Sequence, residues 1–363
     1  MIDRRHFLRA CGAGMLLATA ARAESTPVDR VGEPLVPWRR GMLDIHHIGT
    51  GRGDSTLIID PSGRAALIDA GAMMRLDPAQ VEARPDSSRR PGEWIARYIR
   101  RRLQETDRDR LETIMVTHFH ADHIGEVAGD ETPLHESGAY RLTGVADIAA
   151  EIETAKLIDP DFPEYGYPPF EGRDSVENYI RFAQSFAAAG KPVERLKVGT
   201  SGQVLPDGRY ADGDFSIRAV AARGRIWTGR NDDAREIFPP RSSLAPQEFP
   251  NENASSAALL LRYGAFSYFA GGDLTDWADA GTRPWMNALT PLAQAIGRVD
   301  VSTLPHHGMF DAGSSPTIQA LAARHWVIMA WHALHPGFDI LQRVYNQRLY
   351  SGPRDVYATA LHP

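Results

Sequence analysis

Four potential metal ligands lie within six residues in the stretch "VTHFHADHIG": His118, His120, Asp122 and His123. The apolar run "LETIMV" overlaps its start and predicts a buried strand that ends in a loop. His118 and His120 are two residues apart, so they lie on the same side of an extended segment. Asp122 and His123 fall where the chain should turn into a helix, so two ligand pairs would face two neighbouring metal ions. Imidazoles and carboxylates that converge in this way, with a position left open for water, are what a hydrolytic metal site needs.

Strand and helix patterns alternate around this motif. "TLIID" and "AALIDAG", joined by a Pro-Ser-Gly turn, predict a hairpin. Residues 91–103, "PGEWIARYIRRRL", have apolar residues at helical spacing and a proline at the start, which predicts a helix. "SAALLLRYGAFSYFAGGD" predicts two strands around a Tyr-Gly turn, and a helix and the strand "VDVSTLPHHG" follow. The alternation predicts an α/β fold, with an irregular insertion at about residues 126–250.

The motif "HFHADH" resembles the His-x-His-x-Asp-His motif of the metallo-β-lactamase superfamily. "LIDAG", "YFAGGDLTD" and "STLPHHGM" resemble later landmarks of that family and occur in the family's order. Together with "GRGDS" they are most similar to the subgroup that includes the hydrolase domain of DNA-uptake competence proteins and the phosphorylcholine esterases. The resemblance covers about residues 42–335. It implies a four-layer αββα sandwich and a hydrolase that uses a metal-activated water.

The resemblance also implies a ligand set. His118 and His120 would hold one metal ion, Asp122 and His123 would hold the other, and Asp273 would bridge the two. One of His306 and His307 would complete the second site. Adjacent histidines cannot easily point at one metal ion from a strand, so we expect His306 to be the ligand. The catalytic residues would then be Asp122, which steers the attacking water, and His307, which contacts substrate or protonates the leaving group.

Two further aspartates accompany these landmarks. Asp69, in "LIDAG", is expected to orient a ligand histidine from outside the metal's own shell, or to cap a turn. Asp54, in "GRGDS", either lies near the site or belongs to an ordinary turn.

The sequence departs from the family pattern between the motif and Asp273. Relatives supply another histidine there, but only His135 occurs in this interval, and the strand that should carry the ligand reads "RAVAARG". The polar residues nearest to that strand are Asp232, Asp233, Asn251 and Asn253. We therefore expect one or two divalent metal ions. Ligands without thiolate suit zinc, our first expectation, and also manganese or iron.

The first 23 residues have the pattern of a secretory signal peptide: a basic start, a short apolar stretch and an Ala-Arg-Ala end. The pair Arg4-Arg5 resembles a twin-arginine signal, so the export machinery would be a partner and the location periplasmic or secreted. Residues 24–40 are expected to form an extended leader, and 41–363 the hydrolase domain. The mature chain has no apolar run of membrane-spanning length. Cys11 is the only cysteine, so the mature chain would have neither disulfide nor thiolate.

The net charge indicates which kind of partner the chain can bind. The formal charge is −6, and it falls to −9 without residues 1–23, which hold four arginines and one aspartate. An acidic chain does not favour binding to nucleic acid, although a local basic face would allow it. We expect an exported metal-dependent hydrolase of a small-molecule substrate, specifically of phosphoester or phosphodiester bonds. The alternatives are a lactonase or β-lactamase-type ester or amide hydrolase, and a non-catalytic binding protein that retains the fold.

Overall fold

The computed structural model describes residues 32–75, 77–166, 170, 173–277 and 283–362. The predicted signal peptide and residues 24–31 of the predicted leader lie outside these residues. Residues 38–363 belong to one unit, and the following description concerns this unit. Within the described residues, no helix combines the length and apolar character that crossing a membrane requires.

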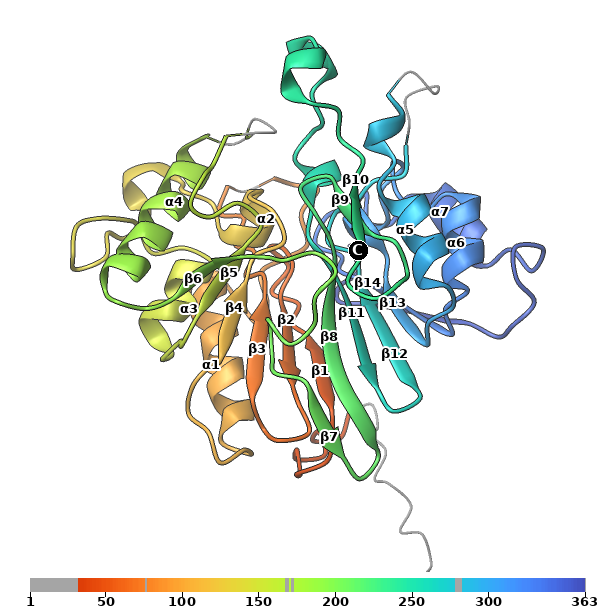
Figure 1. The fold of residues 1–363 in the computed structure, drawn as a ribbon. Helices are drawn as coiled ribbons and strands as arrows, with labels where there is room; N and C mark the ends of the chain where they lie inside the picture. Colours follow the sequence, from red (N-terminus) through yellow and green to blue (C-terminus); the bar gives the residue numbers. More distant parts are fainter. Residues whose placement is uncertain (1–31, 76, 167–169, 171–172, 278–282, 363) are drawn as a thin grey trace, which may run out of the picture. The chain divides into compact units, whose positions relative to one another are not determined.

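Two β-sheets lie face to face at the centre of the unit (Figure 1). Among the described residues the first sheet has six strands in the order β1 to β6: β1 (Asp44–His47), β2 (Thr56–Ile59), β3 (Ala65–Ile68), β4 (Thr113–Met115), β5 (Leu157–Asp159) and β6 (Val193–Arg195). The second follows the order β10-β9-β8-β11-β12-β13-β14-β15, with β7 beside β8: β7 (Gly208–Tyr210), β8 (Gly213–Ala222), β9 (Arg225–Trp227), β10 (Ala234–Glu236), β11 (Ala258–Tyr263), β12 (Phe266–Ala270), β13 (Val301–Thr303), β14 (His325–Ile328) and β15 (Asp355–Ala358). Each sheet begins with antiparallel strands and continues with parallel ones, from β3 and from β12 onward.

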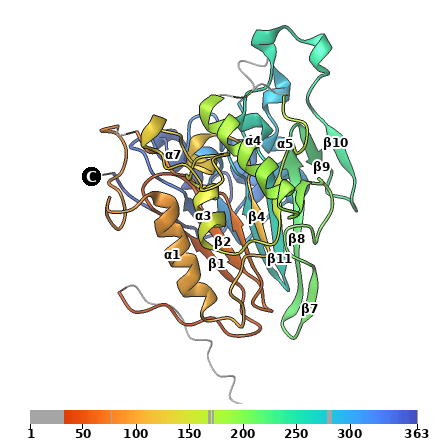
Figure 2. The same ribbon diagram turned by 90° about the vertical axis from the view of Figure 1, so that its left-hand side faces the viewer.

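Helices cover the outer face of each sheet. The first sheet carries α1 (Pro91–Leu103), α3 (Val145–Glu151) and α4 (Arg173–Ala188), and the second carries α5 (Leu289–Ile296), α6 (Ser315–Leu321) and α7 (Phe338–Val344). Figure 2 shows α1, α3 and α4 in front of the first sheet. The predicted helix over residues 91–103 is confirmed with the same bounds.

Alternation along the strands explains the layering. In β2, Leu57 and Ile59 pack with the helices, and Ile58 between them packs against the second sheet. In β11, Leu259 packs against the first sheet and Leu260 packs against the helices on the other side. Because successive side chains of a strand point to opposite faces, strands that are apolar on both faces require cover on both faces. The predicted four-layer αββα sandwich is confirmed.

Residues 126–250 are more regular than the sequence indicated. They contain β5 and β6 of the first sheet and β7 to β10 of the second, together with α3 and α4. Five of these six strands are only three residues long, too short for a period-two pattern to be recognised. Much of this segment therefore belongs to the sandwich itself.

Candidate metal centre

The candidate site lies where four strands of the two sheets end. The parallel pair β3–β4 places the segments after Ile68 and Met115 at one edge, and the parallel pair β12–β13 does the same for the segments after Ala270 and Thr303. The two sheets are joined at this edge, because the amide of Ala257 donates a hydrogen bond to the carbonyl of Thr117 at 2.8 Å. As the sequence predicted, the motif leaves a buried strand and turns into a short helix, α2 (Ala121–Ile124).

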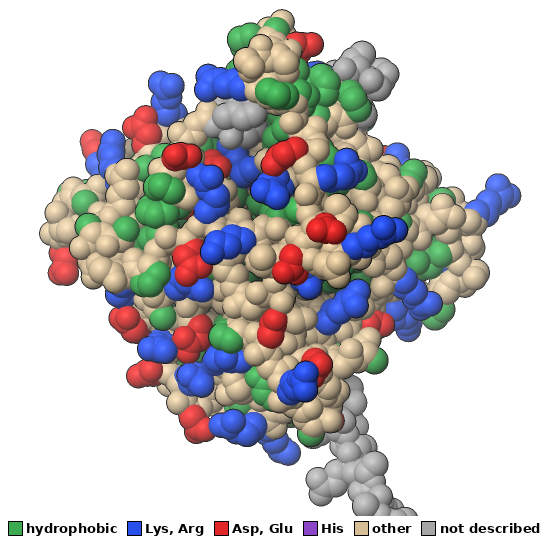
Figure 3. Space-filling model, in the orientation of Figure 1, with side chains coloured by type: hydrophobic (Ala, Val, Ile, Leu, Met, Phe, Trp, Pro, Cys, Tyr) green, Lys and Arg blue, Asp and Glu red, His purple; other side chains and the backbone are tan. Residues whose placement is uncertain are grey.

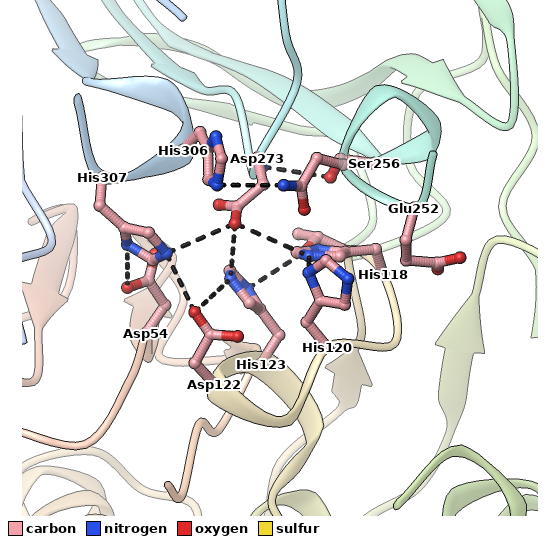
Figure 4. A network of polar contacts seen from close by, with 12 residues as sticks. Asp54, His118, His120, Asp122, His123, Glu252, Ser256, Asp273, His306 and His307 are labelled. Atoms are coloured by element: carbon pink, nitrogen blue, oxygen red, sulfur yellow. Dashed lines mark hydrogen bonds and ion pairs between the residues drawn. The ribbon is translucent and has the colours of Figure 1, made fainter. Parts of the chain in front are cut away.

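One group of possible ligands consists of Asp54, His123, Asp273 and His307, whose donor atoms lie within 4.8 Å of one another (Figure 4). Nε2 of His123 is 3.3 Å and Nε2 of His307 is 3.4 Å from Oδ2 of Asp273. Asp122 lies beside this group, with its Oδ2 3.0 Å from Nε2 of His307 and 3.7 Å from Nε2 of His123. Histidines and carboxylates from four distant segments therefore meet at one point.

A second group consists of His118, His120 and Asp273, again within 4.8 Å. Nε2 of His118 is 3.7 Å from the same Oδ2 of Asp273. Asp273 therefore belongs to both groups, as expected for a bridging carboxylate. The group of His118 and His120 is called the first site below, and the group of His123 and His307 the second site.

Both second-site imidazoles are hydrogen-bonded through the Nδ1 atom, on the side of the ring away from Nε2. Nδ1 of His123 donates to Oδ2 of Asp69 at 2.8 Å, and Nδ1 of His307 donates to the carbonyl of Met329 at 3.0 Å. These bonds set the tautomer and leave both Nε2 atoms facing the carboxylates. Asp69 also accepts from the amide and hydroxyl of Thr117, each at 2.7 Å, so it ties β3 to the motif loop. Asp69 thus makes the orienting contact that the sequence suggested.

His306 differs from the expectation. It belongs to neither group, and its Nδ1 lies 2.6 Å from Oδ1 of Asp311. Its neighbour His307 occupies the second site instead. The expectation assumed an extended chain, whereas both residues have left-handed backbones, with φ of 48° for His306 and 54° for His307. This turn, and not strand alternation, decides which imidazole faces the carboxylates. His307 then has both nitrogens engaged and is not placed as the free proton donor that the sequence suggested.

The electrostatics of the second site favour positive charge. Burial disfavours a charged His307, but the carboxylates of Asp273 and Asp54 hold the pKa of His307 well above its usual range. Burial likewise opposes ionisation of Asp273, but the imidazoles of His307 and His123 hold the pKa of Asp273 well below its usual range. The same field that favours a protonated imidazole favours a bound cation.

At the first site, by contrast, the surroundings disfavour a protonated histidine. Burial, together with the imidazoles of His123 and His120, holds the pKa of His118 well below its usual range. His118 is therefore a neutral imidazole, the form that binds metal.

The residues present fit a divalent cation. Nε2 of His123 and Oδ1 of Asp273 are buried and have no hydrogen-bond partner among the described residues. Asp54, Asp122 and Asp273 place three carboxylates in one cluster, in which Asp122 and Asp273 are buried and Asp54 is half-buried, an arrangement that is costly without a cation between them. Imidazole and carboxylate donors without thiolate suit zinc, manganese and iron.

Two glycines allow the motif loop to reach this position. A Cβ on Gly71 would lie 1.9 Å from the carbonyl oxygen of Asp122, and one on Gly53 would lie 2.4 Å from it. That same carbonyl accepts a hydrogen bond from the amide of Asp54 at 2.8 Å. The "GRGDS" and "LIDAG" segments therefore pack directly on the backbone of the metal motif.

We expect Gly71→Ala to displace the loop at Asp122. The substitution should lower the free energy of unfolding by about 1–3 kcal/mol, as overpacking does, and should weaken metal binding at the second site. Denaturant unfolding and a metal titration measure the two effects. Gly352→Ala is the matched control, because its Cβ would meet no atom closer than 3.9 Å. Equal metal affinity in both variants would contradict this account of Gly71.

Several residues named in the sequence analysis lie apart from the two groups. His135 stacks on Tyr140, with ring centroids 4.5 Å apart, and Asp232 pairs with Arg218 at 2.8 Å. Asn251 caps the backbone at Ala254. Asn253, in contrast, contacts His306. His335, in the segment after β14, stacks its ring on that of His307, with centroids 4.4 Å apart.

A sequence profile of the metallo-beta-lactamase superfamily matches residues 48–129, which include β2, β3, α1, β4 and the whole histidine motif. None of the curated proteins matches the chain. Among solved structures, the chain is similar to CmlA, a diiron beta-hydroxylase from Streptomyces venezuelae, with 12% identity and a TM-score of 0.42 over 90% of this chain. The chain spans about half of CmlA, 53% of its length.

Two other similar structures have comparable or lower scores. YhfI from Bacillus subtilis, a metallo-beta-lactamase fold protein, is 11% identical, with a TM-score of 0.41 and coverage of 86% of this chain and 94% of that one. A HARLDQ motif mutant of a metallo-beta-lactamase from Cronobacter sakazakii is 13% identical, with a TM-score of 0.32 and coverage of 71% and 73%. The profile match falls on the segment that carries the metal motif, and the sandwich and the shared aspartate agree with it. Residues 48–129, which carry the metal motif, are therefore similar to the metallo-beta-lactamase superfamily.

Proposed function

We propose that the chain is a metal-dependent hydrolase of phosphoester or phosphodiester bonds. The observation that carries the proposal is the sharing of Asp273 between two buried ligand groups. Paired sites of this kind suit an in-line displacement at phosphorus, because they stabilise both the attacking and the leaving oxygen. The resemblance of "GRGDS", "LIDAG", "GGD" and "PHHG" to the phosphorylcholine esterase subgroup also supports a phosphoester substrate.

The side chains divide into two ligand sets. His118, His120 and Asp273 would hold a metal ion at the first site, and His123, Asp273, His307 and a carboxylate of Asp122 or Asp54 would hold one at the second. A bound divalent ion lowers the pKa of a water ligand towards neutrality and polarises the bond under attack. His307 becomes a ligand in this proposal, in place of His306.

The chain's other contributions are orientation and charge. Asp69 and the carbonyl of Met329 keep Nε2 of His123 and of His307 directed at the carboxylates. Asp122, whose Oδ2 is 3.0 Å from Nε2 of His307, stands where a carboxylate can accept a hydrogen bond from an attacking water and so orient it.

Export and partners belong to the same proposal. The pair Arg4-Arg5 and the apolar stretch after it support export by the twin-arginine machinery to the periplasm or beyond. On the face seen in Figure 3, basic and acidic side chains are interspersed, which supports a small-molecule substrate over a nucleic-acid backbone.

A substrate panel tests the proposal. We expect the metal-loaded protein to hydrolyse bis(p-nitrophenyl) phosphate and to leave nitrocefin and homoserine lactones largely intact. Turnover of lactones alone would overturn the phosphoester assignment and favour the lactonase alternative. Less than about one equivalent of bound metal, with no turnover of any substrate, would favour the non-catalytic binding protein.

A further inference from the structure

The first site has fewer donors than the second. Its group holds His118, His120 and the shared Asp273, against four residues in the other group, and a four-coordinate metal ion there would take its remaining ligand from water or from a further protein donor. The end of β8, where the sequence pattern would place another ligand, offers only Ala221 and Ala222, both buried. A further donor would therefore come from a segment that packs on this site.

The short 3₁₀ helix Asn253–Ser255 is tied to both halves of the centre. On one side, Glu252 accepts a hydrogen bond at 3.2 Å from the amide of Phe119, the residue between His118 and His120. On the other side, the hydroxyl of Ser256 accepts one at 3.1 Å from the amide of Asp273. His306 and Ser256 flank Asp273 in Figure 4. Asn253 lies between these two anchors in the chain.

The orientation of the Asn253 carboxamide follows from its partner. Nδ1 of His306 donates to the carboxylate of Asp311, with 2.6 Å between the atoms, so Nε2 of His306 is the acceptor. That Nε2 lies 3.0 Å from the carboxamide of Asn253, which must present its NH₂ to it. The carbonyl oxygen then points the other way. It is buried and has no hydrogen-bond partner among the described residues, and Asn253 is only 8% exposed.

We propose that the carbonyl oxygen of Asn253 is a further ligand of the first metal site, and that Asp311 and His306 position it. The inference rests on the metal centre proposed above. A buried carbonyl without a donor is unfavourable, and a cation at the first site would satisfy it. His306 is then a positioning residue, which accounts for a second histidine beside the ligand His307.

With Asn253 as a ligand, the two sites are expected to differ in their affinity for metal ions. The amide oxygen is neutral, so the first site has the single charge of Asp273, whereas the second site also has Asp122 and Asp54 beside it. Because affinity for hard cations rises with the number of charged ligands, the second site fills first and the first site binds more weakly.

A titration of the metal-free full chain with Mn²⁺, followed by calorimetry and by the EPR signal of free Mn²⁺, tests this. We expect two equivalents with separate dissociation constants. Asn253→Ala should weaken the lower-affinity equivalent by about 10-fold or more, within the range seen when groups around a metal are removed, and leave the tighter one unchanged. Asn253→Asp, which keeps an oxygen donor, should restore the lower-affinity equivalent.

Asn178→Ala is the matched control. Asn178 is equally buried, at 7% exposed, but both its amide atoms bond to the backbone of Arg141. Its replacement should leave both dissociation constants unchanged.

His306→Ala should reproduce the effect of Asn253→Ala on the lower-affinity equivalent, and His306→Gln, which keeps an acceptor, should restore part of the affinity. Two unchanged equivalents in Asn253→Ala would overturn the inference and leave the metal centre standing. A single equivalent in the wild type that Asn253→Ala does not alter would also overturn it. Failure of the wild type to bind any Mn²⁺, Zn²⁺ or Fe²⁺ would instead overturn the metal centre itself.

Discussion

Asp273→Ala is expected to remove both bound metal ions and to lower kcat/KM by about 10³-fold or more. Oδ2 of Asp273 lies 3.3 Å from Nε2 of His123, 3.4 Å from that of His307 and 3.7 Å from that of His118. No other residue belongs to both ligand groups found among the described residues. The substitution also removes the negative charge that offsets the positive charge of two metal ions. Metal-ion catalysis is worth several kcal/mol, or about three orders of magnitude in rate.

Metal analysis of the purified variant and its turnover of bis(p-nitrophenyl) phosphate measure these losses. Asp147→Ala is the matched control, because Asp147 is equally buried, at 1% exposed, but belongs to neither ligand group. Its carboxylate pairs with the guanidinium of Arg90 at a distance of 2.6 Å. The control should lose stability but keep its metal. If Asp273→Ala kept two equivalents of metal, Asp273 would not be the bridging ligand.

Removal of the metal ions is expected to lower the melting temperature. Each site contributes about 2.7–4.1 kcal/mol when the free metal concentration is 100 to 1,000 times its dissociation constant. With the entropy of unfolding typical of a domain of this length, that corresponds to a shift of about 4–6 °C per site. The physical cause is the crowding of the half-buried Asp54 and the buried Asp122 and Asp273 in one cluster, whose charge a cation or protonated imidazoles can offset.

Scanning calorimetry of the full chain before and after dialysis against a chelator measures this shift, and re-addition of zinc should reverse it. A variant that lacks one of the three carboxylates, Asp54→Asn, serves as the comparison. It should melt higher than the wild type in chelator, because it has less buried charge to compensate, and should gain less from added metal. Equal melting temperatures of the wild type with and without metal would contradict the account of the cluster.

Local patterns predicted the elements that depend on local physics. The helix Pro91–Leu103 has its expected bounds because apolar residues at helical spacing and Pro91 at its start act together. The hairpin around Gly264 and the turn from β4 into α2 have the same origin. The three-residue strands β5, β6, β7, β9 and β10, between residues 126 and 250, could not be predicted, since they exist through pairing with distant strands and not through their own pattern.

The sequence alone predicted the types of candidate ligand and most of their places, because His118, His120, Asp122 and His123 occur within one short loop whose chemistry allows few other uses. Only the tertiary structure decided how distant segments complete the site. The left-handed turn at His306 and His307 places His307, and not His306, in a ligand group, and the approach of Asp54 and Asn253 depends on glycine contacts and hydrogen bonds between segments far apart in the chain. A short loop is specified by its own residues, whereas the orientation of one imidazole beside another is set by whichever partners the fold places behind each ring.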